Sequence, residues 1–130
     1  MSHSNYSYSK KVTTAFEQAV ENTKQELKKE GFGVLTEINI KATLKKKINA
    51  DIDNYIILGA CHPSSAYQSI QSEIEIGLML PCNVIVYQRD NDVYVAAIKP
   101  SVAMGMIDNN SLSEVASEIE TKLKTVIDNL

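Results

Sequence analysis

The chain has 130 residues, with 13 basic and 16 acidic side chains and a formal net charge of −3. This length fits one domain over residues 1–130, and 44% apolar with 22% charged residues excludes intrinsic disorder as the main state. The acidic balance, with Arg89 as the only arginine, argues against a nucleic-acid-binding surface. No stretch reaches the roughly 18 apolar residues of a membrane span, and no secretory signal is visible, so we expect a soluble cytoplasmic protein.

The first elements follow from simple patterns. Residues 6–12 alternate in period two and predict a strand. Thr14 followed three residues later by Glu17 matches a capping box, which predicts that a helix begins there. Its apolar side chains recur at helical spacing up to Leu27, and Gly31 stands where a left-handed C-cap is expected.

A second period-two segment, residues 32–40, predicts the next strand. Residues 40–48 have apolar side chains at every fourth position and predict a short helix capped by Asn39. The continuous apolar run 55–60 has the length and β-branched content of a strand that is buried on both faces of a sheet.

Ser65 and Gln68 form another capping-box pattern, and apolar positions up to Leu78 predict a third long helix. Two further apolar runs, 84–87 and 93–98, flank a short polar turn, and this arrangement predicts an antiparallel hairpin.

After Pro100 we expect a loop over residues 101–110 and then a last helix, capped by Ser111 and Glu114. The order is strand, helix, strand, short helix, strand, helix, strand, strand, helix. Five strands and about four helices favour an α+β fold, a two-layer sandwich with a mainly antiparallel five-stranded sheet that is covered on one face.

The candidate functional residues lie where two of these elements end. Cys61 ends the apolar strand and is followed by His62 and Pro63, whereas Cys82 begins the next strand after the intervening helix. That helix can return the chain toward the end of the first strand. The two thiols can therefore come close together.

Three interpretations of the two cysteines stay open. A thiol at a helix N-terminus has a lowered pKa, which suits a redox or nucleophilic Cys61 with Cys82 as its resolving partner. Thiolates and an imidazole also suit a zinc or copper(I) site made by Cys61, Cys82 and His62. Free cysteines at strand ends are, however, commonly small buried core residues, and His62 is then an exposed residue before a proline.

Two other features invite an interpretation. Met104 falls in the expected loop, where residues often border a binding site, although methionine is also a common gap filler. The basic run Lys45–Lys47 at the end of a short helix is typical of a solvated face, with an anion-binding patch as the alternative.

Two stretches, Gly59–Ala66 and Leu80–Val84, resemble domain-of-unknown-function family 302, and the resemblance covers nearly the whole chain. It implies a small α+β domain with a mainly antiparallel sheet, often dimeric, in bacterial and archaeal proteins. It implies no activity. The recurrent motif positions of the family fall here on Cys61, Pro63, Ala66, Leu80, Pro81 and Cys82.

We therefore expect a ligand- or metal-binding or sensing module. Its pocket is predicted to be lined by Cys61, His62, Pro63, Cys82 and Met104, and its partner to be a small ligand, zinc or copper. The first alternative is a homodimeric interaction module with structural cysteines. A thiol-dependent enzyme comes last, because no acid, base and charge stabiliser accompany the thiols. Nucleic acid and membranes are not expected partners.

Overall fold

The computed structural model describes residues 4–130 of the chain. The strands are β1 (Ser7–Val12), β2 (Gly33–Asn39), β3 (Tyr55–Cys61), β4 (Cys82–Arg89) and β5 (Asp92–Ile98). The helices are α1 (Phe16–Lys29), α2 (Ile40–Ile48), α3 (Pro63–Ser72), the 3-10 helix η1 (Ile74–Met79), α4 (Pro100–Ala103) and α5 (Asn110–Asp128). None of the helices in this described part of the chain is long and apolar enough to cross a membrane.

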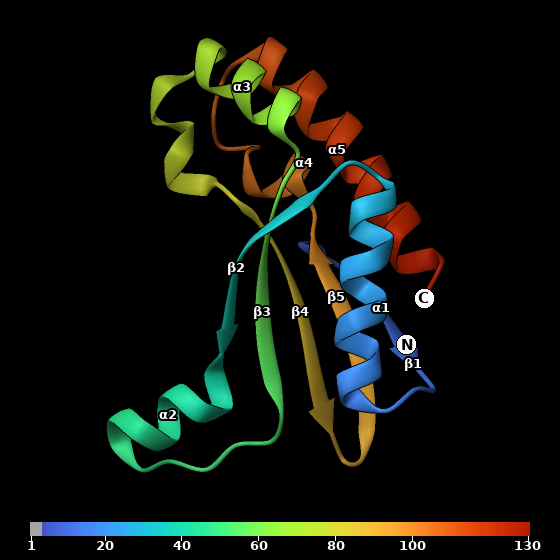
Figure 1. The fold of residues 1–130 in the computed structure, drawn as a ribbon. Coiled ribbons are helices and arrows are strands. Elements are labelled where there is room, and N and C mark those ends of the chain that lie inside the picture. Colours follow the sequence, from blue (N-terminus) through green and yellow to red (C-terminus); the bar gives the residue numbers. More distant parts are fainter. Residues whose placement is uncertain (1–3) are drawn as a thin grey trace.

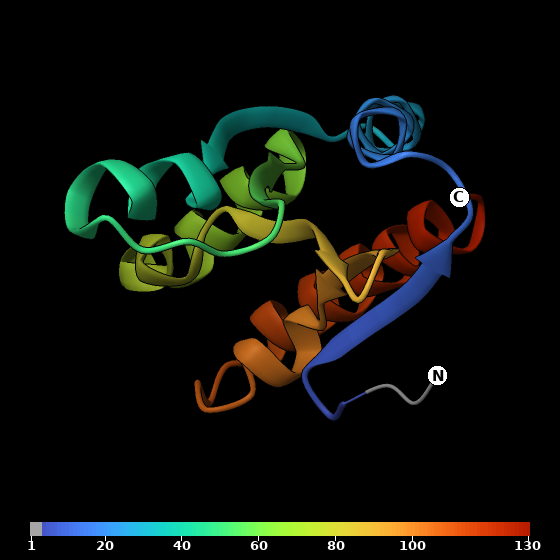
Figure 2. The same cartoon turned by 90° about the horizontal axis from the view of Figure 1, so that it is seen from below.

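The strands form one sheet in the order β1-β5-β4-β3-β2, and every neighbouring pair is antiparallel. Helices α1 and α5 pack together on one side of the sheet, whereas α2 stands off at the other side (Figures 1 and 2). The predicted α+β fold is thus confirmed. Between residues 4 and 130 the helices number 6 rather than about four, because α4 and η1 were not expected.

The main core lies between the sheet and the two long helices. Leu58 of β3, Val84 of β4 and Val95 of β5 are fully buried there. They pack in one cluster with Leu27 of α1 and Ile127 of α5. Burial of such side chains is the dominant favourable term in folding, at roughly 1.5–3 kcal/mol each. The strand pattern therefore fixes which face of the sheet the helices cover.

Helix α1 ends as its sequence predicts. Gly31 has φ +86°, and the N–H groups of Gly31 and Phe32 donate to the carbonyls of Lys28 (3.0 Å) and Leu27 (2.9 Å). This is a Schellman motif, which satisfies the last carbonyls of a helix. It turns the chain so that Phe32 enters the core directly after the helix.

Two more local predictions are confirmed. Asn39 caps α2, because its side-chain oxygen accepts the N–H of Ala42 at 3.0 Å. The hairpin between β4 and β5 turns through Asp90 and Asn91, whose φ angles are +52° and +70°. Positive φ at both central residues identifies a type I′ turn, which matches the right-handed twist of paired strands.

The predicted helix starts were wrong at three places. Helix α1 begins after Ala15 with no side-chain cap, so the Thr14 capping box is not formed. Helix α3 begins at Pro63, because proline with its fixed φ suits the first helical position, and Ser65 therefore lies inside the helix. Helix α5 is capped by Asn109 and not by the predicted Ser111, because the Asn109 side-chain oxygen accepts the N–H of Leu112 at 3.2 Å.

Two segments also differ from their expected structure. The helix predicted to run to Leu78 stops at Ser72 and is followed by η1. The segment after Pro100 starts with the single turn α4 instead of a loop.

The expected burial of β3 on both faces is wrong for the single chain. Ile56, Leu58 and Ala60 point into the core, whereas Tyr55 and Ile57 are only half-buried on the opposite side. The apolar character of that second side is thus left without a matching helix layer.

Candidate functional site

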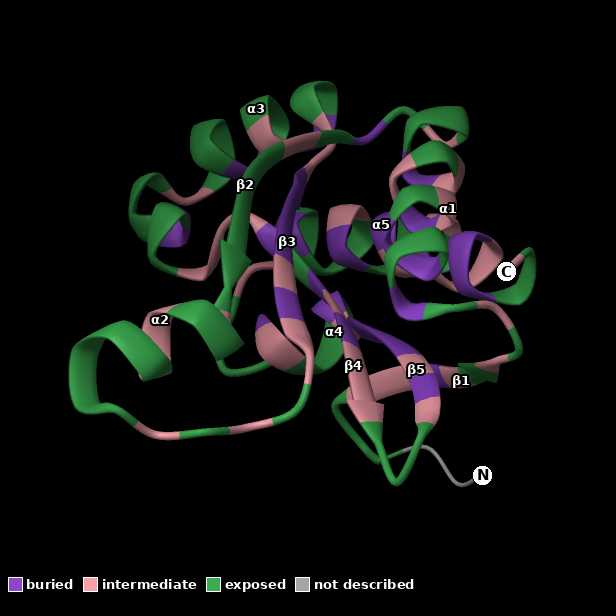
Figure 3. Ribbon diagram, turned by 60° about the horizontal axis from the view of Figure 1, so that its bottom comes forward, coloured by how far each residue is buried: buried purple, intermediate pink, exposed green. Residues whose placement is uncertain are grey.

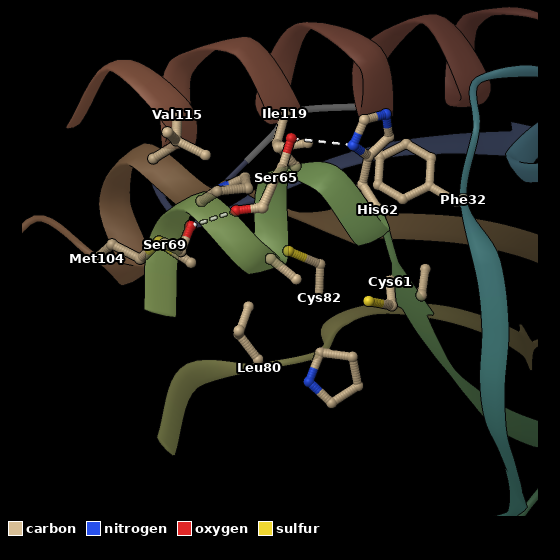
Figure 4. A pocket seen from close by; sticks show the side chains of 15 residues that line it. Phe32, Cys61, His62, Ser65, Ser69, Leu80, Cys82, Met104, Val115 and Ile119 are labelled. Carbon is tan, nitrogen blue, oxygen red and sulfur yellow. Dashed lines mark hydrogen bonds between the residues drawn. The ribbon is translucent and has the colours of Figure 1, made fainter. Parts of the chain in front are cut away.

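A small cavity lies where β3 and β4 meet α3 and α5 (Figure 4). Its volume is about 30 Å³, which leaves room for about one or two water molecules. Its lining brings together Cys61, His62, Cys82 and Met104, as predicted from the sequence. Pro63, the fifth predicted residue, does not line it; it is the first residue of α3.

The two cysteines come near each other, as the predicted topology allowed. Cys82 is paired with Ala60 across β3 and β4, so Cys61 is the next residue along the neighbouring strand. Cys61 is half-buried and Cys82 is buried, and both thiols are free. Burial raises the pKa of Cys82 to about 11, and the nearby Cys61 adds to the increase. Cys82 is therefore a protonated thiol at neutral pH.

The ring of His62 is held at the edge of the cavity by its neighbours (Figure 4). His62 Nδ1 lies 2.9 Å from the hydroxyl oxygen of Ser65, and the ring meets Phe32 edge to face with centroids 5.4 Å apart. A Cβ atom added to Gly31 would lie 3.1 Å from His62 Nε2. Both ring nitrogens thus face the protein around α3 and the end of α1.

The chemistry that the cavity offers is apolar and uncharged. No aspartate, glutamate, lysine or arginine belongs to its lining. Its two serines already have partners, since the Ser69 hydroxyl donates to the Ser65 carbonyl at 2.8 Å and Ser65 contacts His62. Within residues 4–130, no three His, Cys, Asp or Glu side chains are grouped to hold a metal ion. The predicted donor set of Cys61, Cys82 and His62 is not assembled.

A wider groove adjoins the cavity on the side of η1 and α4. It has a volume of about 340 Å³ and is also free of charged side chains. Cavity and groove share one wall, which consists of Leu80, Pro81, Cys82, Pro100 and Met104. The groove opens between the exposed side chains of η1, of which Leu78 is 86% exposed. A shift of the shared wall would join the two spaces.

Sequence reasoning missed most of the remaining lining. Ala66, Leu80 and Pro81 of the lining belong to the stretches that resemble the family, whereas the missed residues come from elements far apart in the chain and include Phe32, Ser69, Ala116 and Ile119. Only Ser65 and Ser69 carried a local signal, because they recur four positions apart on one side of a helix. The others meet only through tertiary packing.

Helix α4 is tied to α5 by Glu120, whose Oε1 accepts the backbone N–H of Ser101 at 3.0 Å and also the Ser101 hydroxyl. Burial by itself would raise the pKa of Glu120, but the hydrogen bonds from Ser101 and the neighbouring Lys124 outweigh it and lower the pKa. This contact holds Pro100 and Met104 in the wall of the cavity.

Glu120→Gln is expected to lower the free energy of unfolding by about 1 kcal/mol at pH 7, because it removes the charge from this hydrogen-bonded carboxylate. The folded-state pKa is the lower one, so the advantage of the wild type is present above the unfolded pKa and is lost as the pH falls through the folded pKa. Urea unfolding at pH 7 and pH 3 measures it, with the exposed Glu118→Gln on the same helix as control. If Glu120→Gln lowers the free energy of unfolding by the same amount at pH 7 and at pH 3, the charge of Glu120 does not stabilise the fold.

Comparison with known proteins places the chain in a family. The family model for the domain of unknown function DUF302 matches residues 8–130. A crystal structure of an uncharacterised conserved DUF302 protein from Bacillus stearothermophilus is similar to this chain, with a TM-score of 0.90 and 30% sequence identity over 96% of this chain and 98% of that one. A search of curated proteins finds no match. With a family model that spans nearly its whole length, the chain belongs to the DUF302 family.

Proposed function

We propose that this domain binds a small, uncharged and mainly apolar ligand at the cavity beside Cys61 and Cys82. The observation that carries the proposal is that this cavity shares one wall with a larger open groove, while neither is lined by a charged side chain. Ligand pockets are mostly apolar, with a few polar groups that set orientation. Here the polar groups are the thiols, His62 and the serine hydroxyls.

The groove supplies the route for the ligand. Leu78 lines the groove and is 86% exposed, so an apolar side chain stands at its opening to water. Met104 stands in the shared wall, and methionine is flexible enough to move aside. A ligand larger than a water molecule would enter from the groove and displace this wall.

Zinc or copper binding stays a prediction of the sequence. An ion that bound Cys82 would have to displace the proton of a thiol whose pKa is raised to about 11, which weakens binding, and His62 is turned toward Ser65, Phe32 and Gly31. These features favour an uncharged ligand over an ion. A thiol enzyme is disfavoured for a related reason, because the lining offers no acid or base other than His62.

The test uses xenon and benzene as probes, followed by amide NMR of the full chain. We expect chemical-shift changes around Ala60, Ser65 and Ala116, which line the cavity. Ala66→Met places a larger side chain in the lining and should abolish these changes. Ala42→Met on the exposed α2 is the matched control and should retain them.

Two outcomes would overturn the proposal. One is that neither probe shifts the amides around the cavity at high concentration. The other is stoichiometric binding of zinc or copper(I) that is lost in Cys82→Ser, since this result would support the metal site instead.

A second candidate function is a homodimeric interaction module, as expected from the sequence. The observation in its favour is the apolar side of the sheet that α1 and α5 leave half-buried, with Tyr55 and Ile57 on it.

A further inference from the structure

The side of the sheet opposite α1 and α5 presents two apolar rows that run across the strands. We name this side the open face and define it by the residues of the two rows. In the first row Ile38, Ile57, Ile85 and Ala96 are consecutive partners on β2, β3, β4 and β5. In the second row Tyr55, Tyr87 and Tyr94 are consecutive partners on β3, β4 and β5.

The tyrosine row forms a continuous stack. The rings of Tyr55 and Tyr87 have centroids 5.9 Å apart, and those of Tyr87 and Tyr94 have centroids 5.2 Å apart, with interplanar angles of 26° and 17°. The three side chains are only half-buried. Tyr55 and Tyr87 border a hollow of about 690 Å³ over this side of the sheet.

This composition is unusual for a water-exposed sheet. An antiparallel sheet that is covered on one side normally alternates apolar residues inward with polar residues outward. Here the outward positions carry isoleucine and tyrosine instead. For this reason the sequence of β3 predicts burial on both faces. In the single chain α1 and α5 cover one face, and Tyr55 and Ile57 on the other face are only half-buried.

Helix α2 borders the open face, and its apolar side chains are also not buried in the single chain. It has nine residues, none of which is buried, although Ile40, Leu44 and Ile48 recur at every fourth position. Figure 2 shows α2 standing off the sheet away from α1 and α5, and Figure 3 shows it exposed along most of its length. So short a helix is marginal in water without tertiary packing. Its apolar stripe is thus incompletely buried, with Ile40 and Leu44 half-buried and Ile48 exposed.

Charges around these surfaces complement each other. Lys46 and Lys47 stand at the end of α2, whereas the hollow over the open face is bordered by two acidic residues, Asp53 and Asp90, and by one basic residue, Arg89. Within residues 4–130, none of these five side chains is in an ion pair. Attraction between the end of α2 in one molecule and the rim of the open face in another is thus available.

The area also fits an association of two copies. Five strands of six to eight residues cover about 24 Å by about 20 Å, or about 500 Å² in projection. The nine-residue α2 adds about 130 Å², so the projected area is about 600 Å² per copy. The accessible surface of a side-chain-covered face exceeds its projection, which brings this area toward the roughly 800 Å² per partner that is typical of a stable interface. A two-fold axis lets the same surface serve both copies, which is the commonest arrangement among homo-oligomers.

We propose that two copies of this chain associate through their open faces about a two-fold axis, with α2 of each copy packed against the sheet of the other. This inference rests on the second candidate function, the homodimer, and assigns its surface. The ligand cavity lies at the other end of β3 and β4 and stays accessible in such a dimer.

Sedimentation equilibrium of the full chain tests the proposal. We expect a dimer at micromolar concentration for the wild type. Tyr87→Glu places a charge in the middle of the interface and should weaken association at least about 100-fold. Leu78→Glu is the matched control, because Leu78 is 86% exposed on η1, away from the open face, and this variant should remain dimeric.

Leu44→Glu on α2 is the second variant and keeps the test decisive if Tyr87→Glu fails to fold. Leu44 is not buried in the single chain, so its replacement leaves the core intact while it removes the apolar stripe of α2. It should also weaken the dimer. A wild-type chain that is monomeric at about 100 μM would overturn both the dimer and its surface. A dimer that withstands Tyr87→Glu and Leu44→Glu but is broken by Leu78→Glu would overturn only the surface.

Discussion

Gly59→Ala is expected to lower the free energy of unfolding by about 3 kcal/mol, because the strand has no space for a side chain at this position. A Cβ atom on Gly59 would lie 2.9 Å from Cγ of Pro81 and would overlap the hydroxyl of Thr36 on β2. The threonine side chain can rotate away, but the proline ring at the start of β4 has no such freedom. Chemical denaturation followed by circular dichroism measures the loss.

Gly33→Ala is the matched control for this substitution. Gly33 lies on the neighbouring strand opposite Cys61, and an added Cβ would meet nothing within 4 Å. Its stability should stay within about 0.5 kcal/mol of the wild type. In a Thr36→Ala background the loss caused by Gly59→Ala should shrink but persist, since Pro81 remains. A complete rescue by Thr36→Ala would contradict the assignment of the main clash to Pro81.

The position of Gly59 links the core to the cavity. Pro81 and Cys82 form part of the wall between cavity and groove, so pressure from an alanine at position 59 would be transmitted to that wall. The glycine thus allows β4 to begin close enough to β3 for the two cysteines to meet. In the sequence Gly59 lies in an apolar run and opens a stretch that resembles the family, but neither feature shows that a side chain there would meet Pro81 and Thr36.

The elements that the sequence predicted correctly carry their own local signals. Asn39 caps α2 through a side chain three positions from its partner N–H, and Gly31 provides the left-handed residue that α1 needs to end. The hairpin follows from the two-residue turn Asp90-Asn91. In each case the deciding interaction joins residues a few positions apart, so the pattern and the structure agree.

The wrong or missing predictions have two causes. One is a competing local signal: Ser65 matched a capping pattern, but Pro63 starts α3 two residues earlier and the Ser65 hydroxyl contacts His62 instead. The other is tertiary packing: Cys61 and Cys82 line the same cavity, which the expected topology allowed without requiring it. Phe32 and Ile119 reach the same cavity only because α1, β2 and α5 pack around it, and no short sequence pattern encodes that meeting.

Cys82 is expected to resist alkylation in the folded protein. In the Cys61→Ser variant, where it is the only thiol, its reaction with iodoacetamide at pH 8 should be about 200-fold slower in the folded chain than in the chain unfolded by urea. The reason is that only the thiolate reacts, and a pKa of about 11 leaves far less thiolate than the ordinary value of about 8.5. Cys82→Ser, which retains the half-buried Cys61, is the matched comparison. Equal rates for folded and unfolded Cys82 would contradict its burial.

The same thiol should make the fold sensitive to alkali. Well below pH 8.5 Cys82 is protonated in both states, so it causes no pH dependence. As the pH rises through about 8.5, only the unfolded chain releases the proton readily, and stability falls until the folded thiol ionises near pH 11. The wild type should therefore lose about 2 to 3 kcal/mol more than Cys82→Ala between pH 9 and pH 11. Comparing the two proteins removes the contributions of tyrosine and lysine. If the free energy of unfolding falls equally in the wild type and in Cys82→Ala, the protonation state of Cys82 does not affect the stability of the fold. A clear difference means that the cavity favours a neutral thiol, the state expected of a wall that contacts an uncharged ligand.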